Sequence, residues 1–282
     1  MTPRVKQRSV IATAALVAVA VIAYAVFLGA LYFKQERLIF PGRPLAADFQ
    51  FHFDQRFEEV RIPVPGATLH ALHFMQEQPR GLVFFLHGNV GNLQTWTTGI
   101  DFYRRVNYDL FIFDYRGYGK STGKIESEAQ LQADVRAAWD TIAPRYGGKT
   151  IVIYGRSLGT GLAAKLASEV DAQLLVLVSP YSSLATAAKE DYPLAPEWLL
   201  KYPLRTDQVI GSVKMPIVLL HGSEDRRIPL AHSQRLAALA RSPVELIVVE
   251  GAGHDDIHRF PNYLDALATR LIAAGKPSLT QP

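Results

Sequence analysis

The sequence contains no cysteine, and this absence excludes several kinds of chemistry. Such a chain has no disulfide, no thiolate-bound metal and no cysteine nucleophile. The lack of cysteine does not identify the compartment in which the protein works. The 8 histidines are therefore the only imidazoles to assign to catalysis or to structure.

The chain also lacks a marked excess of one charge. Its formal net charge is +4, and Arg4, Lys6 and Arg8 near the N-terminus account for most of that excess. The rest of the chain is nearly neutral and has no basic stripe of the kind that nucleic-acid binding requires.

We find no internal repeat and no low-complexity stretch. At 282 residues and 49% hydrophobic, the chain has the composition of one large globular domain or two small ones.

A long stretch without any charge runs from Val10 to Phe33 and is almost wholly apolar. At about 1.5 Å per residue it is long enough to cross about 30 Å of hydrocarbon as a helix. We therefore expect residues 1–33 to be an N-terminal stub and a single transmembrane helix. Ala23-Tyr24-Ala25 also fits a signal-peptide cleavage site, which the sequence leaves open as an alternative.

The residues that flank this stretch bear on its orientation and on its distance from the rest of the chain. Arg4, Lys6 and Arg8 precede it, and the basic side chains after it are more spread out, so the positive-inside rule favours a cytoplasmic N-terminus and an extracytoplasmic body. Residues 34–45 are expected to form a tether that reaches at most about 40 Å and keeps the body near the membrane.

The remaining chain, residues 46–276 before a tail at 277–282, alternates apolar strands with helices. A hairpin is predicted over Phe57–Phe74, and a helix over Ser127–Tyr146 that opens with a capping-box pattern. Another helix is predicted around Thr95–Val106. Such alternation favours a mostly parallel sheet with helices on both faces, whose ligands bind at the carboxyl ends of the strands.

The stretch around Ser157 is the strongest functional motif. Apolar residues 151–153 predict a buried strand, an Ala- and Leu-rich helix follows from Leu162, and Gly155-Arg156-Ser157-Leu158-Gly159 joins them. A G-x-S-x-G sequence between strand and helix is typical of a nucleophile elbow. The simpler alternative is that Ser157 only caps the helix.

A serine nucleophile needs a base and an orienting acid. Asp225 and His254 each follow a predicted strand, and the order Ser157, Asp225, His254 is the one expected for this kind of sheet. Glu224 is an alternative acid. The backbone N–H groups of Leu158 and Asn89 are the expected oxyanion donors, and His87 is expected to brace the loop that carries Asn89.

These motifs resemble those of α/β-hydrolases, in particular the membrane-associated branch similar to serine aminopeptidases, monoacylglycerol lipases and protein depalmitoylases. The similarity extends over about Leu38–Ala274. It implies an α/β-hydrolase fold and matches Asp225 to the acid, with Asn89 and Leu158 at the oxyanion positions. It also implies that Asp114 and Arg116 support the loop beneath the site. The matching segments are His87–Asn92, Asp114–Ser121, Tyr154–Gly159, His221–Pro229 and Gly253-His254.

Residues 180–207 interrupt the alternation where this fold places a cap. Tyr181, Tyr192 and Trp198 of this insertion are candidates for an acyl pocket, although rings of this kind equally serve to pack an insertion onto the core. His258, four residues after His254, suggests a metal pair but lacks an evident third ligand.

Taken together, the sequence predicts a membrane-anchored serine hydrolase that cleaves acyl esters or thioesters, with small-molecule or lipid substrates. No metal or organic cofactor is implied, and the oligomeric state is not indicated. Three alternatives remain: a peptidase or amidase, an acyltransferase, and a non-catalytic membrane-bound binding module.

Overall fold

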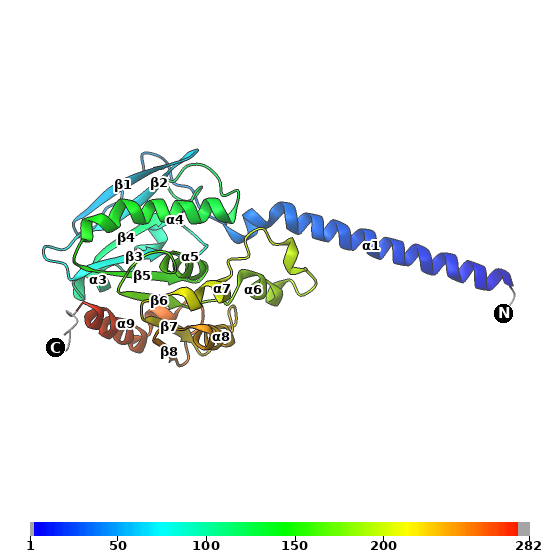
Figure 1. Cartoon of the computed structure of the whole chain (residues 1–282). Helices are drawn as coiled ribbons and strands as arrows, with labels where there is room; N and C mark the ends of the chain where they lie inside the picture. The colour runs from blue at the N-terminus through cyan, green and yellow to red at the C-terminus, as the bar shows by residue number, and fades with distance from the viewer. Residues whose placement is uncertain (1–2, 276–282) are drawn as a thin grey trace.

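The computed structural model describes residues 3–275, with side chains from residue 11 onward. A long helix projects from a body in which helices cover both faces of a central sheet (Figure 1). The expected tail at residues 277–282 lies outside the described residues.

The sheet has eight strands in the order β1-β2-β4-β3-β5-β6-β7-β8. Strands β3 to β8 run parallel, while β2 pairs antiparallel with both β1 and β4. The expected hairpin is confirmed as β1 and β2, which turn at Gly66 with a φ of 75°. The strands are β1 (Phe57–Val64), β2 (Ala67–Phe74), β3 (Gly81–Leu86), β4 (Asp109–Asp114), β5 (Thr150–Arg156), β6 (Leu174–Val178), β7 (Ile217–Gly222) and β8 (Val244–Val249).

Two apolar clusters bury the two faces of this sheet, which is why its central strands are apolar throughout. One cluster includes side chains of α4, α5 and α8, and the other includes side chains of α3 and α9. The α-helices are α1 (Pro3–Ile39), α2 (Leu93–Trp96), α3 (Asp101–Arg105), α4 (Glu128–Ile142), α5 (Leu158–Ala167), α6 (Leu184–Asp191), α7 (Thr206–Val209), α8 (Ala231–Leu239) and α9 (Pro261–Ala274). Short 3-10 helices are η1 (Ala143–Tyr146), η2 (Glu197–Leu199), η3 (Ile210–Ser212) and η4 (Ile257–Arg259).

The prediction of a single helix around Thr95–Val106 is wrong. The structure instead has α2 and α3, separated by Thr97–Ile100. Two threonines and Gly99 lie in that gap, and these residue types favour helices less than most. The helix predicted from Ser127 is confirmed as α4, and the Ser127 hydroxyl accepts a hydrogen bond from the N–H of Gln130 at 3.1 Å.

The N-terminal segment also differs from expectation. Helix α1 continues to Ile39, six residues into the expected tether. The rest of that segment lies against the body, because Gly42 and Pro44 form bridges with Gly91 and Gly119. Residues 34–45 are thus part of the folded structure, and they end beside the loop that carries Asn89.

Candidate active site

Ser157 lies between the last residue of β5 and the first residue of α5, at the carboxyl end of the sheet. Its backbone has φ 50° and ψ −119°, outside the conformations that a serine usually adopts. Strain of this kind in a non-glycine residue is a feature of functional sites, where the surrounding structure enforces it.

The two glycines around Ser157 allow the strand and helix to approach closely. A Cβ on Gly159 would lie 2.0 Å from the carbonyl oxygen of Leu86 in β3, and one on Gly155 would lie 2.7 Å from the Cβ of Ala163 in α5. Neither glycine has a positive φ, so the requirement is space rather than an unusual backbone conformation.

The structure brings His254 to Ser157, although 97 residues separate them. The Nε2 atom of His254 lies 2.9 Å from the Ser157 hydroxyl, within hydrogen-bond distance. His254 lies in the loop after β8, and the side chain of Asp256 helps to shape that loop by accepting a hydrogen bond from the N–H of Gly253 at 2.8 Å.

Asp225 lies on the other side of the imidazole, in the loop after β7. Its Oδ2 atom is 2.8 Å from Nδ1 of His254, and its Oδ1 accepts hydrogen bonds from the N–H groups of Arg227 and Ile228. Burial by itself would raise the pKa of the Asp225 carboxyl, but the hydrogen bonds from His254 and from the N–H of Ile228 outweigh burial and hold that pKa below its usual value. The ionised acid therefore fixes Nδ1 of His254 as the proton-bearing nitrogen, which leaves Nε2 free to accept the proton of Ser157. The alternative acid, Glu224, has an exposed side chain.

Asn89 and Leu158, which are expected to supply the oxyanion donors, line the same cavity as Ser157. Leu158 is the first residue of α5, so its N–H has no partner within the helix. A Cβ on Gly88 would lie 3.6 Å from the Cβ of Ser157, which shows how closely the loop of Asn89 approaches the hydroxyl. The N–H of Asn89 belongs to the same peptide as the Gly88 carbonyl, which lies 2.7 Å from Nδ1 of His87. The carbonyl of Asn89 itself accepts a hydrogen bond from Tyr118 at 2.8 Å.

Buried polar groups support this loop from below. The His87 ring is fully buried, donates from Nδ1 to the carbonyl of Gly88 at 2.7 Å and stacks on Trp96. Asp114 accepts the N–H of Leu93, and Arg116 makes a two-bond ion pair with the buried Asp134 of α4. None of these side chains has a hydrogen bond to the Ser157 hydroxyl, and their partners fit the supporting role that the resemblance implies.

Comparisons with known proteins agree with this geometry. Residues 77–206 match the sequence family described as "Serine aminopeptidase, S33". The chain is 34% identical over 190 residues to alpha/beta hydrolase domain-containing protein 17B of Xenopus laevis, over 66% of this chain and 64% of that protein. It is 36% identical over 193 residues to protein 17C of Mus musculus, over 67% of this chain and 58% of that protein. This chain thus covers about three-fifths of the length of the curated relatives it matches.

Solved structures show the same fold. An esterase of Pyrococcus furiosus superposes with a TM-score of 0.63 at 24% identity, covering 77% of this chain and 92% of that one. A monoacylglycerol lipase of Paleococcus ferrophilus superposes with a TM-score of 0.59 at 19% identity, covering 73% of this chain and 99% of that one. The chain therefore has the α/β-hydrolase fold.

The predicted cap, residues 180–207, lies between β6 and β7 and contains α6, η2 and the start of α7. A cavity of about 220 Å³ lies between the cap and Ser157. Tyr181 and Tyr192 line it, as expected, and the Tyr181 hydroxyl also donates to the carbonyl of Leu158 at 2.8 Å. Tyr181 therefore both lines the cavity and holds the first turn of α5.

Trp198 does not line this cavity, and its assignment to the pocket is wrong. Its side chain is 78% exposed on the outer side of the cap. Sequence reasoning also missed the four lining residues outside the cap that belong to no predicted site: Arg227 and Ile228 beside the acid, and Leu38 and Ile39 at the end of α1. The apolar pair Leu38-Ile39, directly after the polar residues 34–37, was the available signal.

His258 lies beside Arg156, with its Nδ1 3.3 Å from a guanidinium nitrogen. Among the described residues, no group of three or more histidine, aspartate or glutamate side chains is arranged to hold a metal ion.

Proposed function

We propose that this protein is a serine hydrolase that cleaves acyl esters or thioesters through an acyl-enzyme. The observation that carries the proposal is the continuous set of hydrogen bonds from Ser157 through His254 to Asp225, with both bonds between 2.8 and 2.9 Å. The names of the relatives, among them an esterase and a monoacylglycerol lipase, support the same class of reaction.

In the proposed mechanism His254 removes the hydroxyl proton as Ser157 attacks the acyl carbonyl carbon. The N–H groups of Leu158 and Asn89 stabilise the oxyanion, and Asp225 offsets the charge on the imidazolium. His254 then gives the proton to the departing alcohol or thiol. A water molecule then attacks the acyl-enzyme through the same steps, and the carboxylic acid product is released.

We further propose that α1 anchors the enzyme in a membrane and that the body lies on the extracytoplasmic side. Residues Ile11–Ile39 have a mean hydropathy of 2.6 over their most apolar window, and none of that window is buried within the structure. An apolar helix of this length, exposed over its most apolar window, is long enough to cross the hydrocarbon of a bilayer. Lipid or lipid-modified acyl compounds are therefore the proposed substrates.

A panel of acyl esters and thioesters of graded chain length tests this function on the full-length protein in detergent. Ser157→Ala is expected to lower kcat by about a thousandfold or more. Ser168→Ala, at the other end of the same helix, is the matched control and is expected to keep full activity. A folded wild type that hydrolyses none of the panel would favour the non-catalytic binding module, and activity on aminoacyl amides alone would favour a peptidase.

A further inference from the structure

The end of α1 is attached to the cap by several contacts. The amide of Gln35, which is buried, accepts a hydrogen bond from the N–H of Lys201 at 2.7 Å and donates to the carbonyl of Leu199 at 3.3 Å. Phe40 packs edge-on against Tyr202 with ring centroids 5.0 Å apart. The position of the last turns of α1 relative to the cap is therefore defined by the fold.

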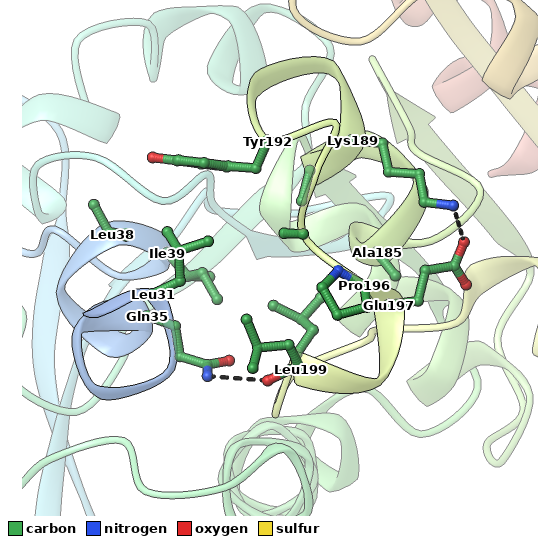
Figure 2. A pocket seen from close by; sticks show the side chains of 13 residues that line it. Leu31, Gln35, Leu38, Ile39, Ala185, Lys189, Tyr192, Pro196, Glu197 and Leu199 are labelled. Atoms are coloured by element: carbon green, nitrogen blue, oxygen red, sulfur yellow. Dashed lines mark hydrogen bonds and ion pairs between the residues drawn. The ribbon is translucent and has the colours of Figure 1, made fainter. Parts of the chain in front are cut away.

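Between these last turns and the cap lies a second, smaller cavity of about 90 Å³ (Figure 2). Leu31, Gln35, Leu38 and Ile39 form one wall, and their spacing places them on one face of α1. The opposite wall comes from α6 and the segment after it, including Ala185, Ala195 and Leu199.

This cavity is suited to an alkyl chain. Most of its lining is aliphatic, and three of the polar side chains at its edge already have partners: Gln35 bonds to Leu199, and Lys189 pairs with Glu197 at 2.8 Å (Figure 2). A cavity lined mainly by apolar side chains favours apolar ligands.

The second cavity adjoins the one that contains Ser157. Five residues line both of them: Leu38, Ile39, Ala188, Tyr192 and Leu200. A chain that begins at the Ser157 hydroxyl can therefore pass between α1 and α6 along these shared residues, four of which are aliphatic.

The cap also presents apolar side chains alongside the apolar part of α1. The Tyr24 hydroxyl of α1 donates to the carbonyl of Leu194 at 2.8 Å, so this loop of the cap reaches a position well inside the apolar stretch. Leu194 and Trp198 are 71% and 78% exposed. Exposed leucine and tryptophan side chains are typical of a surface that contacts a membrane interface.

We propose that α1 is one wall of the acyl-binding site. A long acyl chain lies in the groove between residues 31–39 of α1 and the cap, and it enters that groove from the bilayer side. Helix α1 then selects for chain length in addition to anchoring the protein. This inference rests on the proposed hydrolase function.

The test compares kcat/KM for a sixteen-carbon and a four-carbon acyl ester on the full-length protein in detergent. Leu31→Trp and, from the opposite wall, Ala195→Trp fill the groove at positions that do not line the cavity of Ser157. Each is expected to lower the long-chain to short-chain ratio by about tenfold or more, while short-chain activity stays near that of the wild type. Leu16→Trp, at a 71% exposed position of the same helix, is the matched control and leaves the ratio unchanged.

Two results would overturn the inference: a wild type with no preference for the long chain, or an unchanged ratio in both groove variants. Failure of the hydrolase function itself is recognised separately, because the wild type then hydrolyses neither ester.

Discussion

At the scale of single residues, the two oxygens of Asp225 have different partners. Oδ2 bonds to His254, whereas Oδ1 bonds to two backbone N–H groups of its own loop. Asp225→Asn preserves the size of the side chain but favours the wrong tautomer of His254. We expect kcat to fall by about ten-thousandfold, measured on the best ester of the panel.

Glu224→Gln is the control for this change, because it alters the neighbouring carboxyl without touching His254. Its kcat is expected to remain within about twofold of the wild type, in keeping with an exposed side chain. Equal losses in both variants would contradict the assignment of Asp225.

The lowered pKa of Asp225 also predicts an effect on stability. In the unfolded chain this carboxyl has a pKa of about 3.9, and in the folded protein the value is lower. The charged form therefore stabilises the folded state at neutral pH, and this contribution is lost as the pH falls through the folded-state value. The difference in melting temperature between wild type and Asp225→Asn, measured in detergent, should shrink as the pH falls from about 6 to about 3. A difference that grows toward acid pH would contradict this.

At the scale of elements, the contact between α5 and β3 determines where the elbow lies. A Cβ on Gly159 would lie 2.0 Å from a backbone oxygen that cannot move away cheaply. We expect Gly159→Ala to lower the melting temperature and to reduce kcat by about a hundredfold, since even a displacement of about 1 Å is costly at a catalytic site. Gly99→Ala is the control: nothing lies within 4 Å of its added Cβ. Similar melting temperatures and activities for both variants would show that this contact does not position Ser157.

The elements that could be predicted are those set by local patterns. The apolar strands, the Ser127 cap and the hairpin at Gly66 each depend on residues close together in the chain. The break between α2 and α3 is not predicted, because the sequence analysis treats residues 95–106 as one helical stretch. The low helix propensity of Thr97, Thr98 and Gly99 is the physical reason for the break.

The expected triad residues could be named because strand order and motif order together limit which loops meet at the carboxyl end of a parallel sheet. The residues that form the cavity walls could not be predicted in this way. Gln35 and Leu199 are 164 residues apart, and no local pattern relates α1 to the cap. Trp198 illustrates the same limit, since aromatic character alone does not say which side of the cap a ring occupies.

At the scale of the whole molecule, the proposed orientation places α1 in the membrane and the body outside the cytoplasm. Because the chain has no cysteine, single cysteine substitutions give a clean readout of topology. A membrane-impermeant maleimide added to intact cells is expected to label Glu250→Cys, an exposed position of the body, and to leave Ser9→Cys unlabelled until the cells are permeabilised. The reverse pattern would place the body in the cytoplasm.

The most direct test of the central claim, that Ser157 is the activated nucleophile, is labelling with a fluorophosphonate followed by peptide mapping. We predict one modification, on the peptide that contains Ser157, which Ser157→Ala abolishes and His254→Ala strongly reduces. A folded wild type that remains unlabelled, or labelling that persists undiminished after Ser157 is replaced, would contradict the account.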